Sequence, residues 1–245
     1  MNPWIIAHRG ASGTCPENTL ESFWTAIAAG ADIIEFDLQF SADKEIIIFH
    51  DRTVDRVFNK SIGKSISDYL LDDLQEQDVG SWFDPAYSWS RIPTFKETIE
   101  KLPKTTSMIT EIKSTDLNLV TEVLNLLDDS RKSLGLGYIS VRDVHTYNLV
   151  RDASSRYRIG LMQKQRSPNE LLNLLEEEDI QLVQIRWRNW QNSEWIKLKE
   201  SNVLVTAFYA DYPNEYEFLC QQRIEGILTN FPSRMSSFFL QNKSQ

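Results

Sequence analysis

The chain has 245 residues, with 26 basic and 35 acidic side chains and a formal net charge of −9 at pH 7. That length suits one α/β barrel or at most two smaller domains. The negative charge argues against binding to nucleic acid or to an anionic membrane by bulk attraction. An anionic substrate would therefore be held by a metal and a few locally placed basic side chains.

Two cysteines are present, so the chain can build neither a disulfide framework nor a cysteine zinc site. We expect no signal peptide, because the first residues lack a basic region and contain only the short apolar run Trp4–Ala7. No segment approaches the roughly 18 apolar residues that a membrane span needs. A cytoplasmic location is the default expectation.

Short apolar runs alternate with amphipathic stretches along the chain, a pattern typical of a parallel sheet covered by helices. Trp4–Ala7 is the first predicted strand. A helix is predicted over Pro16–Ala29, because proline suits a first turn and Gly30 would end the helix. The later predicted strands are Asp32–Phe40, Glu45–Phe49, Met108–Ile112, Gly137–Val141, Arg158–Met162, Leu182–Ile185, Val203–Phe208 and Gly226–Leu228. Further predicted helices are Leu117–Leu127, Asn169–Glu178 and Asn214–Gln222.

If Glu45–Phe49 extends the strand before it, eight strands remain, which predicts an α/β fold of the TIM (β/α)8 barrel type, a single domain over residues 1–245. Residues 52–93 contain no clean strand–helix unit and are predicted to form a small inserted subdomain after the second strand. It would carry a short helix near Ser67–Gln77 and an aromatic stretch from Trp82 to Trp89. Because long insertions in βα loops lie over the active face of a barrel, we expect this one to shape the pocket.

Acidic side chains occupy alternate positions on two of the predicted strands. Glu35 and Asp37 are two residues apart, so they point to the same side of one strand, and Glu111 lies near the end of another. If these strands line a barrel, the three side chains meet at its C-terminal mouth. Three carboxylates are hard oxygen ligands, which suit one divalent cation, Mg²⁺ or Ca²⁺, better than zinc.

Histidines and basic side chains also follow predicted strands. The first strand continues into His8 and Arg9, another run ends at His50, and Lys113 follows the strand that carries Glu111. Arg9 and Lys113 can bind a phosphate through charge-assisted hydrogen bonds. His8 and His50 can take up and release protons near neutral pH. A metal, cations that neutralise phosphate and an acid–base pair are what hydrolysis of a phosphodiester needs.

Other polar and aromatic residues have simpler interpretations. His145 is expected at the start of a surface helix, without a function. The Trp-rich segment Arg186–Trp190 is compatible with ligand binding, but packing between helices is favoured. Cys15 is expected to be a small buried residue.

These residues resemble the glycerophosphodiester phosphodiesterase family, and the similarity covers nearly the whole chain. It rests on His8-Arg9-Gly10, Pro16-Glu17-Asn18-Thr19, Glu35-Phe36-Asp37, His50-Asp51 and Glu111-Ile112-Lys113, and continues in Gly80-Ser81-Trp82-Phe83, Ile92-Pro93-Thr94-Phe95 and Gly226–Pro232. The resemblance implies a TIM barrel with an inserted subdomain, and a small-molecule glycerophosphodiester substrate cleaved to glycerol 3-phosphate and an alcohol. It implies metal ligands at Glu35, Asp37 and Glu111, catalytic histidines at His8 and His50, phosphate contacts from Arg9 and Lys113, and support of the first loop by Glu17 and Asn18.

Two segments depart from the family pattern. Near the seventh strand the family often has Trp-Thr-Val-Asn, whereas this chain has Phe208-Tyr209-Ala210-Asp211. Before the last helix a Thr-Asp pair is usual, whereas this chain has Thr229-Asn230. Phe208 still offers a hydrophobic wall of the substrate pocket, smaller than tryptophan and without the indole donor. The departures concern substrate preference and leave the reaction type unchanged.

Two alternatives to this function are open. A lysophospholipase D or another lipid phosphodiesterase on the same barrel would need an apolar groove, for which the insertion offers Trp82, Phe83, Tyr87 and Trp89. A non-catalytic binding module would have lost a histidine or an acid, and none is missing. The sequence predicts neither the alcohol head group nor the oligomeric state.

Overall fold

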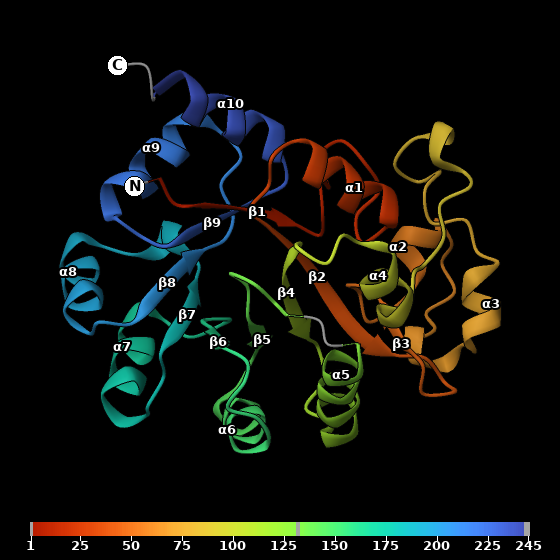
Figure 1. The fold of residues 1–245 in the computed structure, drawn as a ribbon, viewed down its shortest axis with the longest axis horizontal. Coiled ribbons are helices and arrows are strands. Elements are labelled where there is room, and N and C mark those ends of the chain that lie inside the picture. Colours follow the sequence, from red (N-terminus) through yellow and green to blue (C-terminus); the bar gives the residue numbers. More distant parts are fainter. Residues whose placement is uncertain (1, 131–132, 243–245) are drawn as a thin grey trace.

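Residues 2–130 and 133–242 are described by a computed structural model of the chain. Eight parallel strands form a closed barrel, because β1 pairs with β2 on one side and with β9 on the other (Figure 1). The predicted TIM barrel is confirmed, and the strand bounds differ from the expected ones by at most two residues. The barrel strands are β1 Trp4–His8, β2 Ile33–Phe40, β4 Ser107–Ile112, β5 Ile139–Val141, β6 Ile159–Met162, β7 Leu182–Ile185, β8 Leu204–Ala207 and β9 Gly226–Thr229.

The remaining strand, β3, spans Ile46–Ile48 and pairs antiparallel with residues 38–40 of β2. The prediction that this stretch extends the second strand is therefore wrong. The chain reverses in the turn between the two strands, where Ser41 N–H donates to Glu45 O at 3.0 Å and Lys44 adopts a φ of 66°. β3 thus lies outside the barrel and directs the chain into the insertion.

Helices lie outside the barrel between its strands (Figure 1). The first helix begins at Leu20 and not at Pro16, because Thr19 is its N-cap and accepts a hydrogen bond from Ser22 N–H at 3.3 Å. No described helix is long and apolar enough to cross a membrane. The helices are α1 Leu20–Ala28, α2 Asp55–Phe58, α3 Leu71–Gln75, α4 Phe95–Lys101, α5 Leu117–Asp129, α6 Val144–Ala153, α7 Pro168–Glu177, α8 Asn192–Glu200, α9 Pro213–Gln222 and α10 Pro232–Asn242.

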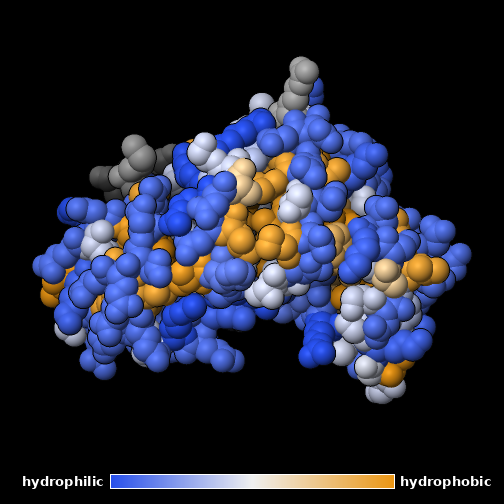
Figure 2. Space-filling model, turned by 90° about the horizontal axis from the view of Figure 1, so that it is seen from below, coloured by the Kyte–Doolittle hydropathy of each residue, from blue (hydrophilic) through white to orange (hydrophobic). Residues whose placement is uncertain are grey.

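Alternation of side chains along the strands separates two apolar regions. The main core lies between the strands and the surrounding helices and includes Phe23, Phe36 and Phe95. A smaller cluster fills the barrel and consists of Ile6, Ile33, Ile109, Tyr138, Leu182 and Leu228. Hydrophilic side chains cover most of the face seen in Figure 2, with hydrophobic ones in a broken band across its middle. The cluster inside the barrel supports the polar residues that follow it on the same strands.

The insertion forms a lobe with its own apolar cluster, beside β3 at the side of the barrel (Figure 1). In place of one helix near Ser67–Gln77, a 3-10 turn spans Ile66–Asp68 and α3 spans Leu71–Gln75. The lobe reaches the barrel mouth through Arg56, which contacts the loop before α1. That the insertion covers the active face stays a prediction.

Candidate active site

The strand register brings the polar positions of β1, β2 and β4 together at the C-terminal mouth of the barrel. His8 is the pairing partner of Glu35, and Asp37 is the partner of Glu111. Because Ile6, Ile33 and Ile109 lie inside the barrel, the residues two positions further along each strand point the same way. The sequence prediction that these side chains converge agrees with this geometry.

Three carboxylates form a compact buried group. Oxygen atoms of Glu35, Asp37 and Glu111 lie within 4.8 Å of one another, and all three residues are buried. Lys113 bridges two of them, with Nζ 3.0 Å from Asp37 Oδ1 and 3.1 Å from Glu111 Oε1. Arg142, which sequence reasoning missed, contacts Glu111 Oε1 through Nε at 2.7 Å and Nη2 at 2.6 Å.

The group is electrostatically asymmetric. Burial, together with the charges of Asp37 and Glu111, raises the pKa of Glu35 well above its ordinary value. Burial acts in the same direction on Asp37, but the charges of Lys113 and Arg9 outweigh it and hold the pKa of Asp37 below its ordinary value. Glu35 is thus the carboxylate whose ionised form is least compensated.

The donor set fits a divalent cation. Three carboxylates in close contact suit a hard cation, and its charge would relieve the repulsion that raises the pKa of Glu35. Asn18 donates from Nδ2 to Asp37 Oδ2 at 2.8 Å, while its buried Oδ1 has no partner in the described part of the chain. The group can therefore hold a metal ion.

The loop between β1 and α1 positions the basic side chain nearest the acids. Arg9 has a φ of 56°, its N–H donates to Glu35 Oε2 at 2.9 Å, and its Nε lies 3.5 Å from Asp37 Oδ2. Gly10 follows at a φ of 80°, where a Cβ atom would come within 2.3 Å of Ser22 Oγ. Only glycine lets the chain turn this closely against α1.

Glu17 contacts this loop, and its supporting role stays a prediction. Its carboxylate accepts from Arg9 Nη1 at 3.0 Å and from Arg56 of the insertion at 2.6 Å and 3.1 Å. Although burial alone would raise its pKa, the hydrogen bonds and charges of these two arginines keep the pKa of Glu17 below its ordinary value. The charged carboxylate thereby links the insertion to the first loop.

His8 lies at the mouth with one ring nitrogen already bound. Its Nδ1 is 2.8 Å from Asn230 Oδ1, which follows β9, and its ring stacks on Tyr209 with 5.4 Å between ring centroids. Burial, with a further contribution from the charge of Arg9, lowers the pKa of His8 to about 4. His8 is therefore neutral at pH 7 and can accept a proton at Nε2.

His50 has a different partner. Its Nδ1 lies 2.6 Å from Asp51 Oδ1, and Asp51 Oδ2 accepts from Arg56 Nε at 2.6 Å. A carboxylate only accepts, so Nδ1 of His50 carries a hydrogen and Nε2 is left for other contacts. Burial would raise the pKa of Asp51, but the hydrogen bonds from His50 and Arg56 outweigh it and hold that pKa below its ordinary value.

Phe208 lines a cavity of about 280 Å³ together with Tyr209 and the exposed Arg186. Tyr209, one of the lining residues, also stacks on His8. The tryptophans of the Arg186–Trp190 segment pack as expected, because Trp190 lies 5.6 Å from the ring of Trp195. The role of Phe208 as a pocket wall stays a prediction.

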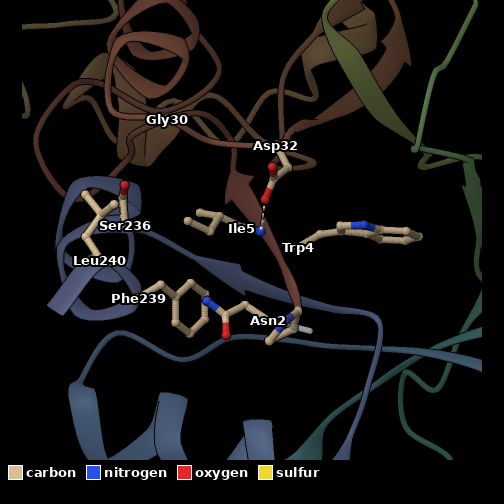
Figure 3. A pocket seen from close by; sticks show the side chains of 9 residues that line it. Asn2, Trp4, Ile5, Gly30, Asp32, Ser236, Phe239 and Leu240 are labelled. Atoms are coloured by element: carbon tan, nitrogen blue, oxygen red, sulfur yellow. Dashed lines mark hydrogen bonds between the residues drawn. The ribbon is translucent and has the colours of Figure 1, made fainter. Parts of the chain in front are cut away.

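Residues outside this region fit their simpler interpretations. His145 is exposed on α6, and Cys15 is buried. A cavity of about 590 Å³ lies at the start of β1, between β1 and α10 (Figure 3). It is at the opposite end of that strand from His8, and its carboxylate Asp32 is bound by Ile5 N–H at 2.8 Å. This cavity is no part of the candidate site.

Sequence reasoning assigned no site role to Asp51, Arg56, Arg142 and Asn230, which contact predicted site residues, or to Asp211, which contacts Asn230. Asp51 directly follows His50, and Arg142 follows β5, so adjacency to a strand end was an available signal for both. Arg56 comes from the insertion, and its partners depend on tertiary packing. Asp211 and Asn230 are the two polar residues at which the chain departs from the family pattern.

Several known proteins resemble this chain in sequence. The model of the glycerophosphoryl diester phosphodiesterase family matches residues 8–234. A putative glycerophosphodiester phosphodiesterase of Bacillus subtilis is 43% identical over 110 residues, which are 45% of this chain and 44% of the relative. A lysophospholipase D of Mus musculus is 29% identical over 126 residues, 50% of this chain and 38% of the relative. The matches thus span less than half the length of these relatives.

Solved structures resemble the fold over almost the whole chain. A phosphodiesterase of Oleispira antarctica, in complex with the product sn-glycerol-3-phosphate, has a TM-score of 0.86 at 23% identity and covers 97% of both chains. A glycerophosphodiester phosphodiesterase of Agrobacterium tumefaciens has a TM-score of 0.79 at 20% identity and covers 97% of this chain and 100% of its own. Given the match to residues 8–234, the chain belongs to the glycerophosphoryl diester phosphodiesterase family.

Proposed function

We propose that the protein hydrolyses glycerophosphodiesters to glycerol 3-phosphate and an alcohol, with one divalent cation, Mg²⁺ or Ca²⁺. The observation that carries this proposal is the buried carboxylate group of Glu35, Asp37 and Glu111 at the barrel mouth, with His8 beside it. The family match supports the reaction, and the neighbour that holds sn-glycerol-3-phosphate supports the product.

The charges at the mouth suit an anionic substrate once a cation is bound. Three basic side chains, Arg9, Lys113 and Arg142, pair with Asp37 or Glu111 of the carboxylate group, and Arg9 also pairs with Glu17. A divalent cation would leave the site positive, which favours a phosphodiester anion in a chain whose total charge is −9. Glu35, Asp37 and Glu111 would hold the cation, which would supply Lewis-acid chemistry. In this proposal Arg9 and Lys113 contact the phosphate.

The histidines carry the proton transfers in this proposal. His8 takes a proton at Nε2 from the attacking oxygen as that oxygen bonds to phosphorus, and His50 gives a proton to the alcohol oxygen as its bond to phosphorus breaks. The attacking oxygen is the glycerol 2-hydroxyl in the route that we favour. Water then attacks the phosphorus of the cyclic phosphate and gives a proton to His50, while His8 returns its proton to the 2-oxygen as the bond between that oxygen and phosphorus breaks. Such intramolecular attack can lower the barrier by roughly 7 to 11 kcal/mol relative to a bimolecular step.

The test is incubation of the protein with a panel of glycerophosphodiesters and coupled detection of glycerol 3-phosphate. We expect turnover with Mg²⁺ or Ca²⁺, loss of turnover with EDTA and recovery when the cation is restored. Full activity in chelator would contradict the metal assignment. A folded protein that cleaves no member of the panel with either cation would contradict the proposed reaction.

The lysophospholipase D alternative is supported by the mouse relative and is tested by adding micellar lysophospholipid to the same panel. Three of the four aromatic residues that an apolar groove would use contact one another, with 6.0 Å between the rings of Phe83 and Tyr87 and also between those of Trp82 and Phe83, whereas Trp89 is exposed. Because most of this aromatic surface packs against itself, the soluble diester is favoured as substrate. The cytoplasmic location and the lack of nucleic-acid binding stay predictions from composition.

A further inference from the structure

Two residues outside the metal group form a continuous hydrogen-bonded connection to His8. Asn230 follows β9, and its Oδ1 lies 2.8 Å from His8 Nδ1. Asn230 also donates from Nδ2 to Asp211 Oδ2 at 2.7 Å and from its backbone N–H to Asp211 Oδ1 at 2.8 Å. Asp211 lies between β8 and α9, so two loops of the barrel mouth meet at this contact.

The chemistry of the three groups leaves one arrangement of hydrogens. A carboxylate only accepts hydrogen bonds, so the amide nitrogen of Asn230 has to face Asp211. The amide oxygen then faces His8, and an oxygen only accepts, so His8 Nδ1 has to carry the hydrogen. Nε2 of His8 keeps its lone pair. Asp211 therefore determines, through Asn230, which nitrogen of His8 can accept a proton.

Asp211 is itself held in place. Its Oδ1 accepts a hydrogen bond from the buried Thr229 hydroxyl at 3.1 Å, and its backbone oxygen accepts from Arg234 Nη1 at 2.7 Å. Ser12 Oγ lies 2.7 Å from the backbone oxygen of His8 and 2.9 Å from Asn230 Oδ1, so its single hydrogen is shared between two acceptors. A flip of the Asn230 amide would place its oxygen against the Asp211 carboxylate, so Asp211 is the group that resists the flip.

We propose that Asp211 and Asn230 are a positioning pair that holds His8 in the Nδ1–H tautomer and so keeps Nε2 as its proton acceptor. This inference rests on the proposed function, in which His8 is the general base. Of the two side chains, the neutral amide of Asn230 is the one that contacts His8, and the carboxylate of Asp211 contacts the amide.

The first test is Asp211→Asn. Without the carboxylate the Asn230 amide can turn in either direction, so His8 should populate both tautomers. The ¹⁵N chemical shifts of the His8 ring in the folded protein report the tautomer directly. We expect mixed ring shifts and a loss of about 10- to 100-fold in kcat, the usual effect of removing an outer partner of a site residue, with little change in KM. Asp152→Asn, on the exposed surface of α6, is the matched control and should behave as wild type.

The second test exchanges the pair. Asn230→Asp alone places two carboxylates in contact and should lower both kcat and Tm. Asp211→Asn combined with Asn230→Asp restores one amide and one carboxylate, with the carboxylate now accepting from His8 Nδ1. We expect this double variant to regain the Nδ1–H shifts and most of the kcat that each single variant loses.

Two results would overturn the positioning pair: Asp211→Asn with wild-type ring shifts and kcat, or a folded double variant no better than the single ones. The ring shifts are measured without substrate. Failure of the wild-type protein to cleave any diester would therefore refute the proposed function while the tautomer result still tests the pair.

Discussion

Glu35 is the carboxylate of the metal group that forms no salt bridge within the described chain. Asp37 and Glu111 share Lys113, and Glu111 also pairs with Arg142. Glu35 accepts only a backbone N–H, at 2.9 Å, a contact that a glutamine oxygen can also accept. We therefore predict that Glu35→Gln stabilises the metal-free protein while it abolishes the response to the cation.

The magnitude follows from the geometry. Two unit charges 4.8 Å apart repel by about 3.5 kcal/mol at an effective dielectric constant of about 20. Attraction from Arg9 offsets part of this repulsion, so we expect a net gain of about 1 to 3 kcal/mol, or a rise in Tm of about 2 to 12 °C for a chain of this size. The folded-state pKa of Glu35 is raised, so its ionised form weakens the fold above its unfolded pKa. The gain should therefore be present at pH 7 to 8 and shrink as the pH falls and Glu35 takes up a proton.

The assay is thermal unfolding in EDTA and with excess Mg²⁺ or Ca²⁺. Wild type should gain stability from the cation by mass action, and Glu35→Gln should gain little. Glu111→Gln is the matched control. It should lower Tm in EDTA, because Arg142 and Lys113 lose a charged partner. A Tm for Glu35→Gln at or below wild type in EDTA, or a full response to the cation, would refute this account of the carboxylate group.

Three further predictions concern the mechanism and the barrel interior. His8→Ala and His50→Ala should each lower kcat by about 10² to 10⁴, while His145→Ala should keep a kcat near wild type. Equal losses at all three positions would show that a place at the end of an apolar strand does not distinguish a catalytic histidine. Tyr138→Phe removes the hydroxyl that contacts the buried side chains of Gln184 and Thr206. It should lower the free energy of unfolding by about 1 to 3 kcal/mol, and an unchanged midpoint of urea unfolding would contradict this. A substrate with hydrogen in place of its 2-hydroxyl should show almost no turnover, whereas a similar kcat would indicate direct attack by water.

The local pattern of apolar and polar residues was sufficient to predict the barrel and the polar residues that follow its strands. Glu35 and Asp37 could be assigned to one side of a strand because side chains alternate there, whichever strands lie alongside. His8 and His50 stood out because each ends an apolar run. These features depend on residues close together in the chain, so they can be read without knowing the fold.

The tertiary structure determined which side chains contact the predicted site residues. Arg142 pairs with Glu111 because β5 lies beside β4, and Asn230 reaches His8 because β9 closes the barrel against β1. Hydrophobic periodicity also failed to predict two local features. A turn reverses the chain before β3, and the capping side chain of Thr19 sets the start of α1. Sequence determined which residue types stand at the mouth, because that depends on local alternation. Only the closed sheet determined which of them touch, because those contacts join residues up to 222 positions apart.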